Sequence, residues 1–221
     1  MVVAAVALSA GASGVRQSTS GRITGRITLT ATPRLPLTTS AYGRRDVAPK
    51  SPAATPDTRN VVVYVAGLKP SAPPAAVRAR IAQRDEQFRP QVTAVTVGST
   101  VDFPNEDPFF HNVFSLSRAG SFNLGRYPSG DSKSRRLSAA GTVKVFCHLH
   151  SQMSAVILVL DHPWFAIPSD DGSFTIADVP AGERTVVAWH ERIGERREKV
   201  RIPAGGTAQL AFTLPVLEPE R

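Results

Sequence analysis

The sequence contains a single cysteine, Cys147, and few aromatic residues. With no second cysteine among its 221 residues, an internal disulfide framework is excluded, and so is a binuclear copper site held by two thiolates. Aromatic residues make up 7% of the chain, whereas it has 16 glycines and 18 prolines. This composition favours short strands joined by many turns over long helices. The lone thiol is therefore either inert in a core, reactive, or a metal ligand.

The sequence also lacks an apolar run long enough to span a bilayer as a stable transmembrane helix. A short apolar stretch near the N-terminus is followed by Ala10-Gly11-Ala12, a pattern typical of a signal-peptidase site, although no positively charged residues precede it. We predict that residues 1–20 are a signal or leader segment. The expected location of the protein is periplasmic or secreted.

The charge pattern argues against nucleic acid as a partner. The formal net charge is +8, but the arginines are scattered and do not alternate with aromatic residues as in a nucleic-acid groove. General solvation of the surface is the simplest interpretation of this charge. The alternative is a patch that docks an acidic partner.

The apolar residues follow the two-residue period of β-strands, and no segment keeps a helical period over three turns. We expect strands in the following segments: residues 23–29, 60–67, 95–97, 101–103, 122–124, 136–138, 143–147, 155–160, 174–176, 185–189, 199–202 and 210–214. Residues 31–59 are rich in Thr, Pro, Ser and Ala, a composition that predicts a loop outside the core. The predicted fold class is all-β.

The segment from Cys147 to Met153 carries the main chemical signal. It has a cysteine at the end of a predicted strand, a histidine three residues later and a methionine three residues after that. Thiolate, imidazole and thioether are the ligands of a copper ion that cycles between Cu(I) and Cu(II). One tight loop cannot surround a metal, so a fourth ligand must come from elsewhere. His111, which lies between apolar residues after a turn-rich stretch, fits that role.

Each of these residues alone would have an ordinary interpretation. A histidine in an apolar setting is usually a hydrogen-bonded core residue, and a lone cysteine is usually inert. The combination of His111, Cys147, His150 and Met153 is much harder to obtain by chance, and it predicts one mononuclear metal site. The sequence has no His-x-His pairs in the number that a trinuclear copper cluster needs, which argues against a multicopper oxidase.

The stretch from Gly98 to Leu160 resembles the cupredoxin, or plastocyanin-like, blue-copper domain. The resemblance lies in Val101-Asp102-Phe103-Pro104-Asn105 leading into His111-Asn112-Val113, and in Phe146-Cys147 followed by His150 and Met153, with the short ligand spacing of amicyanins. It implies a Greek-key β-sandwich in which His111 and His150 bind copper through imidazole nitrogen, Cys147 through its thiolate and Met153 axially. It also implies that Asn112 ties the two ligand segments together.

A second resemblance covers the rest of the chain. Residues 172–182, together with 21–29 and 60–67, resemble carboxypeptidase-regulatory-like or transthyretin-like β-sandwich domains, an arrangement found in methylamine-utilisation-like proteins. We therefore expect a cupredoxin domain at residues 77–161, inserted in or joined to a second, small Ig-like β-sandwich. Residues 21–76 would supply its N-terminal strands and residues 162–221 its remainder.

Several other residues could bind ligands, and each has a simpler interpretation. We expect His148 to point to the surface, and His162 and His190 to be structural or exposed. Three aromatic residues are expected to pack in the second sandwich: Trp164, Phe165 and Trp189. The Asp170-Asp171 pair is common in turns that bind no calcium.

Three functions are compatible with this pattern. The leading prediction is an exported copper protein that passes single electrons between redox partners, one of them an acidic cytochrome or oxidoreductase. The alternatives are a copper chaperone or store, and a metal-free structural module. We expect no enzymatic activity, because the sequence has no evident acid-base pair or open coordination position.

Overall fold

The structure is a computed structural model that describes residues 19–31 and 58–216. Within these ranges the chain consists of β-strands, apart from one short 3-10 helix at Thr58–Asn60. The prediction of an all-β fold is confirmed. Most of the predicted leader (1–20) and most of the predicted loop (31–59) lie outside the described residues.

Seven strands build the part of the molecule that we call the outer unit. They are, in chain order, β1 (Ser20–Ala31), β2 (Val61–Ala66), β13 (Phe165–Ala166), β14 (Ser173–Pro180), β15 (Gly182–His190), β16 (Gly194–Ile202) and β17 (Thr207–Val216). Their two sheets have the orders β14-β1-β17 and β13-β2-β15-β16. Buried apolar side chains from both sheets, among them Ile23, Val63 and Phe212, form one shared core. The two sheets therefore face each other across this core.

Ten strands build the other part, which we call the site-bearing unit. They are β3 (Arg78–Arg80), β4 (Ala82–Arg84), β5 (Gln87–Arg89), β6 (Val92–Thr96), β7 (Thr100–Pro104), β8 (His111–Ser117), β9 (Gly120–Tyr127), β10 (Ser132–Arg136), β11 (Gly141–Phe146) and β12 (Ser154–Leu160). A five-stranded sheet, β6-β12-β11-β8-β9, lies opposite a three-stranded sheet, β10-β7-β3, and β4 and β5 form a hairpin. Phe103, Val145 and Ile157 belong to the core of this unit.

Strand alternation gives the site-bearing unit its inward and outward faces. On β11, Val143 and Val145 are buried and Lys144 is exposed, as the two-residue period requires. On β12, by contrast, Ala155 to Leu160 are all buried. This strand is covered on both faces, which explains its continuous apolar sequence.

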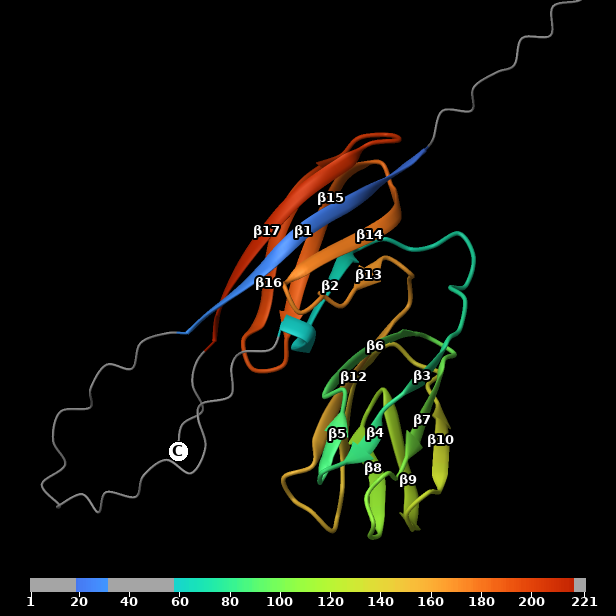
Figure 1. The fold of residues 1–221 in the computed structure, drawn as a ribbon. Coiled ribbons are helices and arrows are strands. Elements are labelled where there is room, and N and C mark those ends of the chain that lie inside the picture. The colour runs from blue at the N-terminus through green and yellow to red at the C-terminus, as the bar shows by residue number, and fades with distance from the viewer. Residues whose placement is uncertain (1–18, 32–57, 217–221) are drawn as a thin grey trace, which may run out of the picture.

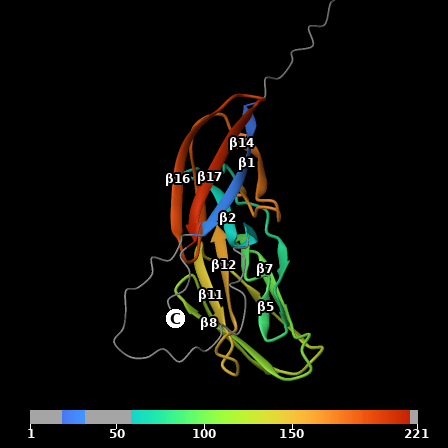
Figure 2. The same ribbon diagram turned by 60° about the vertical axis from the view of Figure 1, so that its left-hand side comes forward.

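The two units are joined by neighbouring strands. The chain leaves the outer unit after β2 and returns to it at β13, and these two strands pair through Phe165 and Tyr64. Figure 1 shows the strands of the outer unit gathered at one end of the molecule and β3 to β12 at the other, and Figure 2 shows the same separation after rotation. A third apolar cluster, with contributions from β2, β6, β12 and β15, lies at the junction: Val62, Val92, Leu158 and Leu160, with Tyr64, Ala94, Phe165 and Trp189 packed against it.

The structure corrects the expected positions of the aromatic residues. Trp164 packs in the core of the outer unit, as expected. Phe165 and Trp189 instead pack against the junction cluster, where β2 and β15 meet β6 and β12. Their side chains thus help to hold the two units together.

The structure also corrects one predicted strand. The strand expected at residues 136–138 lies earlier, at β10 (Ser132–Arg136). Its sequence has no apolar residue, so it carries no period-2 signal. Leu137 is buried, and its backbone N–H and C=O bond to Ser99 and Gly98 in a loop, outside the strand ladder.

Candidate metal centre

Three chain segments bring the predicted ligands together. His111 is the first residue of β8, Cys147 follows the last residue of β11, and His150 lies in the loop between β11 and β12. Cys147 continues the inward face of Val143 and Val145, so its side chain lies in the core, 5% exposed. His111 is fully buried and His150 is half-buried. The loop is closed by a hydrogen bond from the Met153 N–H to the His150 carbonyl, 3.0 Å.

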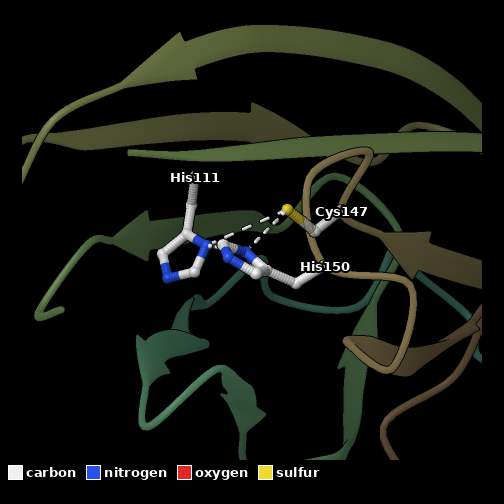
Figure 3. A group of neighbouring side chains, drawn as sticks. All are labelled: His111, Cys147 and His150. Atoms are coloured by element: carbon white, nitrogen blue, oxygen red, sulfur yellow. Dashed lines mark hydrogen bonds between the residues drawn. The ribbon is translucent and has the colours of Figure 1, made fainter. Parts of the chain in front are cut away.

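The ligand atoms of these three residues form a small triangle (Figure 3). The Nδ1 atoms of His111 and His150 are 3.1 Å apart, and Cys147 Sγ lies 3.9 Å from the first and 4.0 Å from the second. Among residues 19–31 and 58–216, this is the only group of three His, Cys, Asp or Glu side chains close enough to share a metal ion.

These separations fit one metal ion. An ion bonded at about 2.1 Å to two nitrogens and at about 2.3 Å to one sulfur can meet ligand atoms at separations of this size. Trigonal coordination by two imidazoles and a thiolate, with a weak axial thioether, is the donor set of blue copper.

Met153 lies in the same core as the thiolate. It is 1% exposed and belongs to the apolar cluster that contains Cys147 and Val145. Burial keeps its thioether away from water, as an axial ligand requires. Its assignment as that ligand stays a prediction.

Asp107 is a residue of the site that the sequence interpretation missed. Its carboxylate Oδ2 lies 2.7 Å from His111 Nε2, and both side chains are almost completely buried. The carboxylate accepts a hydrogen bond from Nε2–H, which leaves Nδ1 with the lone pair that faces the triangle. Asp107 therefore selects the histidine tautomer that can bind a metal there.

The hairpin of β4 and β5 holds Asp107 in turn. The backbone N–H groups of Asp85 and Glu86 donate to Oδ1 and Oδ2 of Asp107, at 2.7 Å and 3.0 Å. Burial raises the pKa of the Asp107 carboxyl, but the hydrogen bonds from His111, Glu86 and Asp85 outweigh it and bring the pKa below its ordinary value. The carboxyl is therefore ionised at neutral pH and accepts all three bonds.

The tip of this hairpin has an unusual backbone. Asp85 and Glu86 have φ values of 54° and 53°, in the left-handed region that glycine or asparagine normally occupies in two-residue hairpin turns. Glu86 also accepts a hydrogen bond of 2.6 Å from Gln152, which lies in the ligand loop. The hairpin tip thus contacts both ligand-bearing segments, through Asp107 on one side and Gln152 on the other.

Asn112 lies next to His111, between the two ligand segments. Its Oδ1 is 3.4 Å from the His148 N–H, a long hydrogen bond, and its Nδ2 donates to Asn123 at 2.9 Å. It therefore contacts the cysteine segment from the β8 side. His148 is exposed, as expected, and its ring stacks on Phe114.

The remaining candidates lie elsewhere. His162 and His190 are buried in the outer unit or at its junction, so the structural interpretation holds and the exposed one does not. Asp171 bonds to Ser173 and pairs with Arg26, and Asp170 pairs with Arg59. The turn that contains both is held by contacts within the protein.

The triangle of ligand atoms lies at the end of the site-bearing unit that carries the loop between β11 and β12, which we call the loop end. At the loop end, Phe109, Phe110 and Leu149 are 38%, 55% and 37% exposed. Beside them is a cavity of about 760 Å³ whose lining includes Asp107 and Gln152. The half-buried His150 is the ligand nearest to solvent at this end.

Comparisons with known proteins give likenesses to copper proteins among solved structures only. No protein-family model and no curated protein matches the chain. The chain is similar to the copper-containing nitrite reductase from Thermus scotoductus, with 23% identity over 43% of this chain and 27% of that chain and a TM-score of 0.37. It is also similar to a purple cupredoxin from Nitrosopumilus maritimus, with 24% identity over 37% of this chain and 98% of that chain and a TM-score of 0.34.

An amicyanin variant in its Cu(I) form is similar to the same extent, with 17% identity over 44% of this chain and 97% of that chain and a TM-score of 0.35. The chain spans 27% of the length of the nitrite reductase and nearly all of the two smaller proteins. All three TM-scores are below 0.5, so the assignment of the metal centre depends on the geometry of its own residues.

No helix within the described ranges is both long enough and apolar enough to cross a membrane.

Proposed function

We propose that this protein binds one copper ion and carries single electrons between redox partners. The observation that carries the proposal is the convergence of His111 Nδ1, His150 Nδ1 and Cys147 Sγ within 4.0 Å of one another. A bound copper ion would supply a one-electron couple between Cu(I) and Cu(II). The proposed axial ligand is Met153.

The protein's own residues would keep the ligand geometry constant while the charge changes. His111 is fixed by Asp107, Cys147 lies at the end of a core strand, and His150 is held by the closed loop. A site that is already folded around its ligands reorganises little when an electron arrives or leaves. The burial of His111 and Cys147 also keeps their side chains away from bulk water.

The proposal includes the domain organisation and the location. We propose a cupredoxin domain at residues 77–161 within a second β-sandwich formed by residues 21–76 and 162–221. The separate cores of the two units, and the pairing of β2 with β13 on either side of the intervening strands, support this division. A leader at residues 1–20 and a periplasmic or secreted location stay predictions from the sequence.

Cyclic voltammetry of the copper-loaded protein tests the electron-carrier function. We expect one reversible wave with one electron per protein. A copper chaperone or store would use the same soft ligands, but it would release copper rapidly to a competing Cu(I) chelator and give slow, irreversible voltammetry. A metal-free structural module would bind copper in neither way.

A further inference from the structure

The outer face of the five-stranded sheet is half covered. On β6 and β12, the outward side chains Val92, Leu158 and Leu160 pack against Val62 and its neighbours in the outer unit. No side chain of β11, β8 or β9 belongs to this apolar cluster, and Lys144 on β11 reaches the outer unit only through an ion pair with Glu191 among the interactions of the described residues. The open half of this face is therefore continuous with an interface that is already built.

The open half carries apolar side chains among its polar ones. Phe146 and Phe114 are paired neighbours on β11 and β8, their rings 5.9 Å apart, and each is only partly buried. Leu116, the next outward residue on β8, is 81% exposed. An antiparallel sheet that faces water usually alternates apolar inward with polar outward residues. This apolar strip (Phe146, Phe114 and Leu116) breaks that pattern.

His148 connects this apolar strip to the proposed metal centre. His148 follows the ligand Cys147 directly in the chain, and its side chain is exposed. Its imidazole stacks flat on the Phe114 ring, with centroids 3.8 Å apart and planes within 2° of parallel. A stacked pair of aromatic rings therefore extends from the residue beside the thiolate to the open sheet face.

The charges around the strip have one dominant sign. Strands β8, β9 and β11 contain no Asp or Glu. Arg126 on β9 pairs in register with Asn112, next to His148, and Arg118 lies in the turn after β8. Lys144 on β11 is paired with Glu191 of the outer unit, 3.2 Å away. By contrast, the cavity at the loop end is lined by Asp85, Glu86 and Asp107 and by no Lys or Arg.

We infer that the outer face of β11, β8 and β9 is a docking surface for an acidic redox protein, and that the electron leaves the protein through His148 and Phe114. The inference rests on the proposed function and adds the partner and the route. One electron leaves the reduced centre by way of Cys147 and His148, and the oxidised group of the acidic partner accepts it. No bond forms or breaks, and no proton is transferred.

Paramagnetic mapping with hexacyanochromate(III) locates the surface that attracts anions. The probe is added to ¹⁵N-labelled protein in its diamagnetic Cu(I) form at low ionic strength. We expect selective line broadening of the backbone amide signals of His148, Leu116 and Arg126. Broadening confined to Leu149 and Phe110 at the loop end would overturn the inference. So would an absence of broadening at the strip, which is the result expected if another segment of the chain covers it.

Stopped-flow oxidation by hexacyanoferrate(III) then tests whether an anionic oxidant approaches the protein at this face. Arg126→Glu should slow oxidation of the Cu(I) protein by about 3–10-fold at low ionic strength, because steering of an anion depends on local charge. Lys199→Glu on β16 makes the same change of charge on the outer unit and should have a much smaller effect. Equal slowing of oxidation by the two variants would contradict electron transfer at this face.

Two further outcomes keep the tests separate. Leu116→Glu should slow oxidation by the anionic oxidant more than Leu149→Glu does, and the reverse order would contradict the inference. Sedimentation tests a second possibility. A dimer that Leu116→Glu dissociates would show that the strip binds a second copy of this chain and not a different acidic protein. If the protein takes up copper without thiolate absorption, the proposed function fails. The anion map can be repeated on the metal-free protein, so this failure is distinguishable from failure of the docking surface.

Discussion

The two units have cores of similar apolar composition but differ in their buried polar groups. Nearly all of the buried polar or charged residues belong to the site-bearing unit, including Gln83, Asn105, Asp107 and His111. Within the described residues, the outer unit and the junction contribute only His162 and His190 to this set. Since buried polar groups cost stability unless they are paired, their concentration in one unit needs a reason.

The difference shows what the fold itself requires. The outer unit builds two facing sheets with an almost purely apolar core, so buried polarity is no requirement of the architecture. In the site-bearing unit, the buried groups bond to one another: Gln83 donates to Tyr127, Asn105 to Phe109, and Asp107 accepts from His111. The last of these contacts positions His111, one of the predicted metal ligands. Substitutions made in one unit at a time test whether the two units have these different roles.

Removal of a core phenylalanine should have the largest effect, and the effect should depend on the unit. Phe103→Ala and Phe212→Ala each remove a buried ring and should lower the free energy of unfolding by about 3–5 kcal/mol. Phe103→Ala should lower the temperature at which copper absorption is lost. Phe212→Ala should leave the copper spectrum at 25 °C unchanged while circular dichroism reports earlier melting. If both variants lost the same amount of copper absorption at 25 °C, separate roles for the two units would be contradicted.

Substitution of Asp107 should weaken copper binding without unfolding the unit. In Asp107→Asn the charged acceptor is lost, and an amide N–H is brought toward the N–H groups of Asp85 and Glu86. We expect copper affinity to fall by about 10–100-fold, measured by competition with a chelator of known affinity. Asp102→Asn is the matched control, because that carboxylate bonds to Arg78 and Ser134 instead. An affinity equal to that of the control would show that Asp107 does not position His111.

Substitution of Met153 should change the reduction potential more than the stability. Met153→Leu conserves volume in the core, so the free energy of unfolding should change by less than about 1.5 kcal/mol. The three remaining ligands should keep the visible absorption. Loss of an axial donor destabilises Cu(II) more than Cu(I), so the potential measured by voltammetry should rise. An unchanged potential would mean that the thioether is not a ligand.

The smallest expected effect is a pH dependence in the outer unit. Burial lowers the pKa of His162, with a small opposing contribution from Asp161. The unfolded chain binds a proton near pH 6.5, whereas the folded protein resists it to a lower pH. Stability is therefore complete above pH 7 and declines as the pH falls from about 6.5 toward the folded pKa.

His162→Phe tests this dependence while keeping a ring against Trp164. Melting temperatures of the metal-free protein between pH 7.5 and pH 5.0 should fall less steeply in the variant than in the parent. Identical slopes would show that the titration of His162 does not contribute.

The sequence singled out His111, Cys147 and His150, which the structure brings together, because such a combination of side chains is rare. Three metal-binding side chains at three-residue spacing, after a strand that directs Cys147 inward, seldom occur together in a protein that binds no metal. Asp107 was missed because an aspartate in a turn is common. Only the folded hairpin, with its N–H groups directed at the carboxylate, distinguishes it from other turn residues.

The hairpin itself was missed for a similar reason. Two-residue turns of this kind are usually recognised by Asn-Gly or Asp-Gly, but here Asp85 and Glu86 adopt positive φ. The three bonds to Asp107 and Gln152 compensate the strain of that backbone. Such tertiary compensation cannot be read from local sequence. The same is true of β10, whose polar sequence is paired with β7 by the fold alone.

Titration of the metal-free protein with Cu(II), followed by visible absorption, tests the central claim most directly. The triangle formed by His111, Cys147 and His150 predicts one intense thiolate-to-copper band that grows to one equivalent and then stops. The band should be absent in Cys147→Ser. A wild-type protein that gives no such band, or a band that keeps growing beyond one equivalent, would contradict a single copper site at these residues.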